Sequence, residues 1–160
     1  MKPLRFLPAA LVLVLLALAV PAPALAGVKV EVAKHKSGPW SPFGLNVHIP
    51  TGDSKNLYIR IKNTSHHAHA KQVNLTERRS ADGPDYQVSW FKGKRDISHD
   101  VQTSGHDFTL KHDRSKRFRL RVKALDGSDQ ECVSGEFAVD PGMFVVVGSF
   151  RANGNAPCLI

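Results

Sequence analysis

The chain has 160 residues, a formal net charge of +8 and only two cysteines. This length suits one globular domain and leaves little room for two. The excess of Lys and Arg over acidic residues favours contact with anionic polymers or surfaces, without identifying one.

The first 26 residues have the order of a secretory signal peptide. Lys2 and Arg5 precede an apolar run over 9–20, which is long enough for a signal sequence and short for a membrane span. Proline residues and the small-x-small segment Ala-Leu-Ala follow that run, so we expect cleavage between Ala26 and Gly27. The protein is therefore expected to be secreted or extracytoplasmic, in a periplasm or at a cell surface. The leader holds two of the basic charges and no acid, which leaves +6 on residues 27–160.

The remaining chain alternates apolar and polar residues with a period of two, which is typical of half-buried strands. In chain order this alternation predicts strands at 28–33, 57–62, 73–75, 86–90 and 117–124. The run over 143–150 is apolar on both faces and predicts a central strand. Gly and Pro clusters separate these runs, and helical spacing is almost absent. About seven short strands predict an all-β fold, a single immunoglobulin-like two-sheet sandwich over 27–160.

Part of this pattern is similar to a known kind of module. The segments in question are YQVSWFKG at 86–93, Asp96-Ile97, FTL at 108–110 and FRLRV at 118–122. They resemble immunoglobulin-like β-sandwich repeats of bacterial secreted and cell-surface proteins. Residues 57–64 resemble the second strand of such repeats, which commonly ends in an Asn-Thr pair. The resemblance covers roughly half of the mature chain and implies a noncatalytic spacer or binding platform, with no particular ligand.

The two cysteines, Cys132 and Cys158, both follow the leader. In an oxidising compartment we expect them to form a disulfide, which would tie the C-terminal tail to the segment before the last strands. Their wide spacing lacks the C-x-x-C form of redox and metal sites.

Three histidines lie close together in a loop after a predicted strand, at His66, His67 and His69. Imidazoles in such a tract could hold Cu(II), Ni(II) or Zn(II). A zinc site normally draws three or four ligands from a fixed scaffold, and no acidic residue is near this tract before Glu77. A solvated polar loop is the alternative interpretation.

A row of basic residues alternates with the core residues of the predicted strand at 117–124. Residues two apart lie on the same face of a strand, so the row shares one sheet face. If this strand pairs with the one at 57–62, as the equivalent strands do in the fold it resembles, two more cations join the row. The predicted polyanion-binding face then comprises Arg60, Lys62, Arg117, Arg119, Arg121 and Lys123. Such a face is also what solubility requires of any exposed strand. Only Tyr58 interleaves an aromatic ring with these charges, which does not favour a nucleic-acid stacking platform.

No motif of known catalytic chemistry is present in the sequence, neither G-x-S-x-G, H-E-x-x-H, a Walker loop nor G-x-G-x-x-G. We therefore predict that the protein is not an enzyme and has no cofactor. Trp40 and Trp90 are interpreted as core anchors of the sandwich.

Three classes of function remain open. The first is a secreted or surface-associated binding or structural module, which contacts an anionic cell-envelope or extracellular polymer, or another protein, through the basic face. The second is an extracytoplasmic metal-binding protein that uses the histidine loop. The third is a secreted inhibitor of a hydrolase.

Overall fold

The computed structural model describes residues 27–42, 44–65, 69–125, 132–142 and 146–153. The predicted signal peptide and Cys158 lie outside these residues, so the cleavage and the disulfide stay predictions. No helix in the described ranges is long and apolar enough to cross a membrane.

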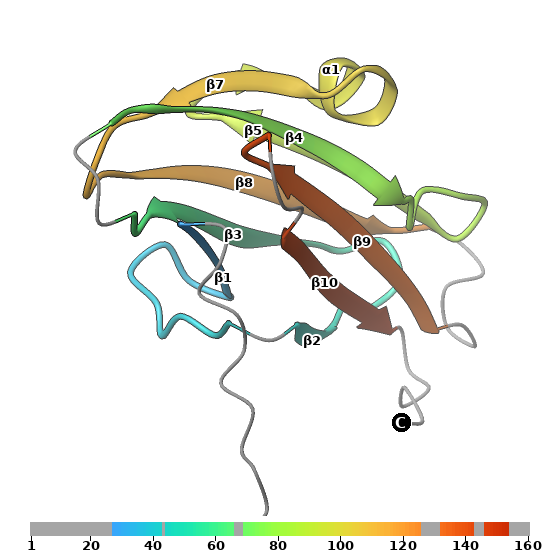
Figure 1. Cartoon of the computed structure of the whole chain (residues 1–160). Coiled ribbons are helices and arrows are strands. Elements are labelled where there is room, and N and C mark those ends of the chain that lie inside the picture. The colour runs from blue at the N-terminus through green and yellow to red at the C-terminus, as the bar shows by residue number, and fades with distance from the viewer. Residues whose placement is uncertain (1–26, 43, 66–68, 126–131, 143–145, 154–160) are drawn as a thin grey trace, which may run out of the picture.

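Strands dominate the described part of the chain (Figure 1). In order along the chain the elements are β1 (Val28–Ala33), β2 (Leu45–His48), β3 (Ser54–Asn63), β4 (Lys71–Arg79), β5 (Tyr86–Lys92), β6 (Arg95–Asp96), α1 (Ser98–Thr103), β7 (His106–Leu110), β8 (Ser115–Ala124), β9 (Cys132–Asp140) and β10 (Val146–Asn153). All the predicted strands are present, and β2, β6, β7 and β9 are additional.

The strands form two five-stranded sheets, in the orders β1-β3-β8-β5-β6 and β2-β10-β9-β4-β7. All pairings are antiparallel except that of β2 with β10, which is parallel. The orders β1-β3-β8-β5 and β4-β9-β10 match the A-B-E-D and C-F-G sheets of an immunoglobulin constant-type sandwich. The predicted all-β sandwich is therefore confirmed, with three short strands, β2, β6 and β7, added to the seven.

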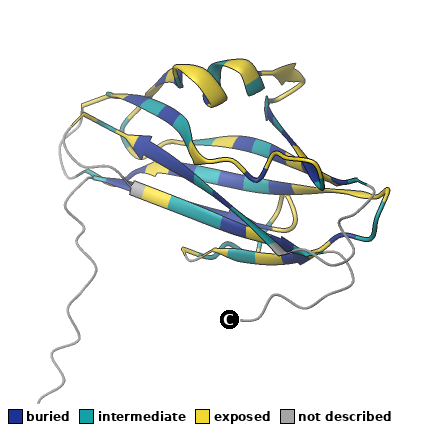
Figure 2. Ribbon diagram, turned by 90° about the vertical axis from the view of Figure 1, so that its right-hand side faces the viewer, coloured by how far each residue is buried: buried dark blue, intermediate teal, exposed yellow. Residues whose placement is uncertain are grey.

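The core lies between the two sheets, and buried residues alternate with exposed ones along the strands (Figure 2). Trp90 on β5 is fully buried and meets Phe137 on β9 edge to face, with 5.6 Å between the ring centroids. An aromatic pair of this geometry contributes about 0.5–1.5 kcal/mol beyond the area that it buries. Trp90 is thus confirmed as a core anchor that joins the two sheets.

Two glycines make room for phenylalanine rings in the second sheet. Gly135 is opposite Phe150, and Gly148 is opposite Phe137. A Cβ added at Gly135 or Gly148 would lie 2.3 or 2.2 Å from the facing ring, closer than any real Cβ contact. The rings therefore occupy the space that side chains at these glycines would need.

Asn63, at the end of β3, fastens the two sheets together where the chain crosses between them. Its buried side-chain amide donates hydrogen bonds to the backbone carbonyls of His69 (3.1 Å) and Leu110 (3.2 Å). Its carbonyl oxygen accepts from the backbone N–H (3.0 Å) and hydroxyl (2.7 Å) of Ser65. These bonds give a structural reason for an asparagine at this strand end.

Replacing Asn63 by Ala should lower the free energy of unfolding by about 2–4 kcal/mol, because the buried bond to the Leu110 carbonyl and three part-buried hydrogen bonds are lost. Urea unfolding followed by circular dichroism would measure the change. Asn56→Ala, an exposed position of the same strand, is the control and should stay within about 0.5 kcal/mol of wild type. A loss at Asn63 no larger than that at Asn56 would contradict the role assigned to the amide.

Candidate functional site

The pairing of β3 with β8 places the basic row on the outer face of the first sheet. Ile59 is opposite Phe118, and both are buried in the core. The intervening positions point the other way, where Tyr58 is opposite Arg119 and Arg60 is opposite Arg117. The predicted pairing is confirmed, and the six predicted cations lie on this one face. We call it the basic face: the outward residues of β1, β3, β8 and β5. Polyanion binding by this face stays a prediction.

Arg60 does not act as a free cation on the basic face, because it is paired with Glu31 of the neighbouring strand β1. Its guanidinium nitrogens lie 2.6 and 2.8 Å from one carboxylate oxygen of Glu31, and Lys29 lies 2.8 Å from the other. Burial of Glu31 opposes its ionisation, but the bonds and charges of Lys29 and Arg60 outweigh it and hold the pKa of the carboxyl below its usual value. Glu31 was not among the predicted site residues, although it is the only acidic residue on β1, β3 and β8.

Arginine side chains on the basic face lie over aromatic rings. The guanidinium carbon of Arg60 is 4.4 Å from the centroid of the Trp40 ring, and that of Arg117 is 5.8 Å from it. The corresponding distance from Arg119 to the Phe91 ring is 4.2 Å. These are cation–π distances, and each such contact restricts where the guanidinium can lie.

Two predictions about aromatic residues are therefore wrong. Trp40 is half-exposed rather than a core anchor, because Ser41 forms a two-bond bridge with Val32 that brings the loop after β1 to the edge of the sheet. Tyr58 is also not the only ring among the charges, since Trp40 and Phe91 join it. Phe91 could have been placed there from the alternation of β5, in which Trp90 points to the core and its neighbour must point outward.

Three open hollows lie along the basic face. The central one, of about 210 Å³, is formed by Lys36, Tyr58, Gly93, Arg117, Phe118 and Arg119. The second, of about 230 Å³, is formed by Gln87, Ser89, Phe91, Arg121 and Lys123. The third, of about 520 Å³, surrounds the Glu31 ion pairs and is formed by Lys29, Glu31, Arg60, Lys62, Thr64, Asp113 and Ser115. The central hollow thus combines two arginines, a lysine and a half-exposed tyrosine ring.

Little of the predicted histidine loop falls within the described residues. His66 and His67 lie outside them, and His69 is exposed. The described ranges contain no group of three or more His, Cys, Asp or Glu side chains that could hold a metal ion. Metal binding by His66, His67 and His69 stays a prediction.

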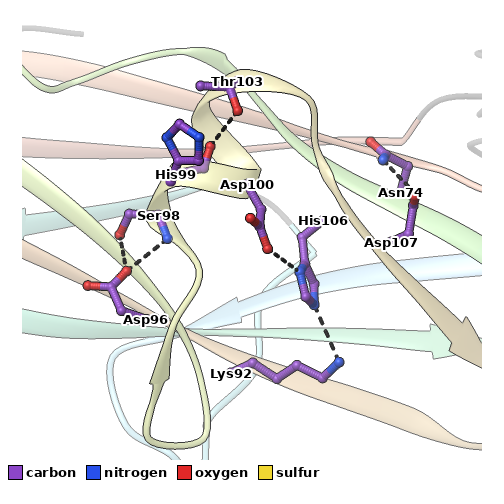
Figure 3. Close-up of polar contacts among 9 residues, drawn as sticks. All are labelled: Asn74, Lys92, Asp96, Ser98, His99, Asp100, Thr103, His106 and Asp107. Atoms are coloured by element: carbon purple, nitrogen blue, oxygen red, sulfur yellow. Dashed lines mark hydrogen bonds and ion pairs between the residues drawn. The ribbon is translucent and has the colours of Figure 1, made fainter.

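A partly buried chain of polar side chains, which was not predicted, joins Lys92, His106 and Asp100 where β5, β7 and α1 meet (Figure 3). The Lys92 ammonium can only donate, so Nε2 of His106 accepts from it at 3.3 Å and Nδ1 donates to Asp100 at 3.2 Å. Burial, with the positive charges of Lys116 and Arg95, lowers the pKa of Lys92. Although His106 lies on an edge strand, its side chain is buried.

Comparison with known proteins shows likeness of fold alone. No protein-family model matches the chain, and no curated protein matches its sequence. Among solved structures, a family 123 glycoside hydrolase from Clostridium perfringens is similar, with a TM-score of 0.50 and 9% identity over 80% of this chain and 27% of that chain. AvmM, described as catalysing macrocyclization in alchivemycin A biosynthesis, has a TM-score of 0.43 and 11% identity over 84% of this chain and 93% of that one. Domains 4 and 5 of the S-layer protein SbsC have a TM-score of 0.34 and 13% identity over 69% and 49%.

The prediction that the protein is not an enzyme is wrong on this comparison. The chain spans about a quarter of the glycoside hydrolase, and its fold is similar to that part of an enzyme. A sandwich of this kind is therefore no ground for excluding catalysis, and that exclusion is withdrawn.

Replacing Glu31 by Gln should lower the free energy of unfolding at pH 7 by about 1–3 kcal/mol, because two basic side chains lose their counter-charge. Since the folded-state pKa of Glu31 is lowered, its contribution is full above the unfolded-state value of about 4.3 and is lost as the pH falls through the folded-state value. The difference between wild type and variant should therefore be smaller at pH 3 than at pH 7, as urea unfolding at both pH values would show.

Glu136→Gln on β9 is the matched control, because no ion pair joins Glu136 to another described residue. A difference between wild type and Glu31→Gln that is the same at pH 3 and pH 7 would show that the carboxylate charge is not what stabilises this edge.

Proposed function

We propose that this protein binds an anionic polymer outside the cytoplasm through the basic face. The observation that carries the proposal is the row on β8. Its four cations point outward, and no ion pair joins any of them to an acidic side chain of the described residues. They are Arg117, Arg119, Arg121 and Lys123.

Electrostatics makes a polyanion a suitable partner for this row. Outward side chains two residues apart on a strand begin about 6.6–6.8 Å from each other. That is within the screening length of about 8–10 Å at physiological salt, so the cations repel one another. A polymer that brings one anion near each cation relieves this repulsion and releases its own condensed counterions.

The proposed location follows from the leader and from the fold. Residues 1–26 have the order of a signal peptide, and the strand order is that of an immunoglobulin-type sandwich. Both agree with a module of the kind found in bacterial secreted and cell-surface proteins. Polymers of a cell envelope or an extracellular matrix are then the anions within reach.

Replacing Arg119 and Arg121 together by Gln should weaken retention on an immobilised anionic polymer and lower the salt dependence of binding by about 1–2 in the log–log slope. The fold should persist, because both side chains point away from the core. Elution from heparin-agarose between low and high salt, with thermal unfolding as a check, would measure both effects.

Arg78→Gln with Arg79→Gln is the matched control, since it removes the same charge from two exposed positions at the end of β4 in the other sheet. Retention lost equally in the two double variants would mean that net charge alone attracts the polymer. Wild-type protein that shows no salt-sensitive retention would remove the basis of the proposal.

A further inference from the structure

Three arginines of the basic face lie near aromatic rings, and these contacts restrict where their guanidinium groups can lie. Arg119 lies over Phe91, and its Nε is covered and has no hydrogen-bond partner among the described residues. Arg117 and Arg60 both lie near the Trp40 ring, and Arg60 also forms an ion pair with Glu31. A guanidinium restricted in this way presents a planar set of donors that suits the paired oxygens of a carboxylate or sulfate.

Neutral hydrogen-bonding side chains face the other cations of the basic face. The outward positions opposite Lys62, Arg121 and Lys123 carry hydroxyl and amide groups, at Ser54, Asn56, Gln87, Ser89 and Ser115. The Ser54 hydroxyl accepts from two nitrogens of Arg121, at 3.2 and 3.1 Å. Hydroxyls and amides both donate and accept hydrogen bonds, as a partner rich in hydroxyl groups requires.

The aromatic rings of the face do not form a platform for nucleic-acid bases. Base stacking needs free ring faces along the strand of nucleic acid. Guanidinium groups already lie over Trp40 and Phe91, whereas Tyr58 has no such contact among the described residues. Tyr58 lies in the central hollow directly opposite Arg119. One ring beside two fixed arginines suits a single sugar ring that carries an oxyanion.

From these observations we infer that the basic face is a binding site for an acidic polysaccharide. One sugar ring packs on Tyr58 in the central hollow, Arg117 and Arg119 bind its carboxylate or sulfate, and neighbouring sugars lie along the serine, asparagine and glutamine side chains. This inference rests on the proposed function, to which it adds the class of polymer. It requires the shape of the guanidinium as well as its charge.

The test uses two double variants. In one, Arg117 and Arg119 are both replaced by Lys, and in the other both are replaced by Gln. Dissociation constants are measured at one ionic strength for polygalacturonate, dextran sulfate and oligothymidylate, with uncharged dextran as a blank. We expect wild type to bind one of the acidic polysaccharides more tightly than oligothymidylate. The Lys double variant should lose about tenfold in affinity, the effect of roughly one charge-assisted hydrogen bond, although its charge is unchanged.

Two further variants test the inference without changing Arg117 or Arg119. Phe91→Leu removes the ring beside Arg119 and keeps every charge, so affinity should fall about two- to fivefold, as loss of a cation–π contact implies. Arg78→Lys with Arg79→Lys makes the same chemical change away from the face and should bind as wild type does. Thermal unfolding checks that each variant is folded.

The outcomes separate the inference from the function on which it rests. Tighter binding of polygalacturonate would identify a carboxylate as the oxyanion, and tighter binding of dextran sulfate a sulfate; each supports the inference. Wild-type affinity in the Lys variant together with weakened binding in the Gln variant would overturn the inference and leave polyanion binding in place. Oligothymidylate bound as tightly as the better polysaccharide would do the same. Unchanged affinity in the Gln variant would overturn both.

Discussion

The antiparallel pairing of β3 with β8 is the constraint on which the rest of the structure depends. Its register places Leu57 and Ile59 against Leu120 and Phe118 on the inner face, and the six cations of the basic row on the outer face. A shift by one residue would bury the arginines and expose the core, which is why hydrophobic burial fixes the register. The free energy of core formation thus also stabilises an arrangement of like charges that would be unfavourable alone.

The strands with regular alternation were predictable because a period of two is a local property of the sequence. Strand β9 was not predicted, because Gly135 interrupts its row of inward apolar residues. The Phe150 ring of the neighbouring strand fills the space at that position. The short helix α1 has too few turns for a periodic signal. Likewise, β10 is paired on both sides as a central strand should be, yet Val147 is 46% exposed, so its outer face is not buried.

The basic row of the candidate site was predictable for the same reason, but its chemistry was not. The ion pair between Glu31 and Arg60 requires β1 to pair with β3 in one particular register. The contact of Trp40 with that arginine requires a loop to fold back over the edge of the sheet. Both contacts join residues that are far apart in the sequence, so local sequence patterns cannot predict them. The six cations appear equivalent in the sequence, but the structure distinguishes them. Arg60 is neutralised by Glu31, Arg117 and Arg119 lie near aromatic rings, and the other three cations have neither contact within the described part of the chain.

The lengths of the outermost strands bear on how the molecule behaves when crowded against copies of itself. An open edge strand offers unpaired backbone groups to another chain, which is a common start of aggregation. Here the edges of the second sheet are β2 and β7, of four and five residues, and the first sheet ends at β6 with two residues. At its other end Ser41 covers part of β1. In the part of the chain that the structure describes, the outermost strands therefore expose only short stretches of backbone, which limits edge-to-edge pairing between copies of the molecule.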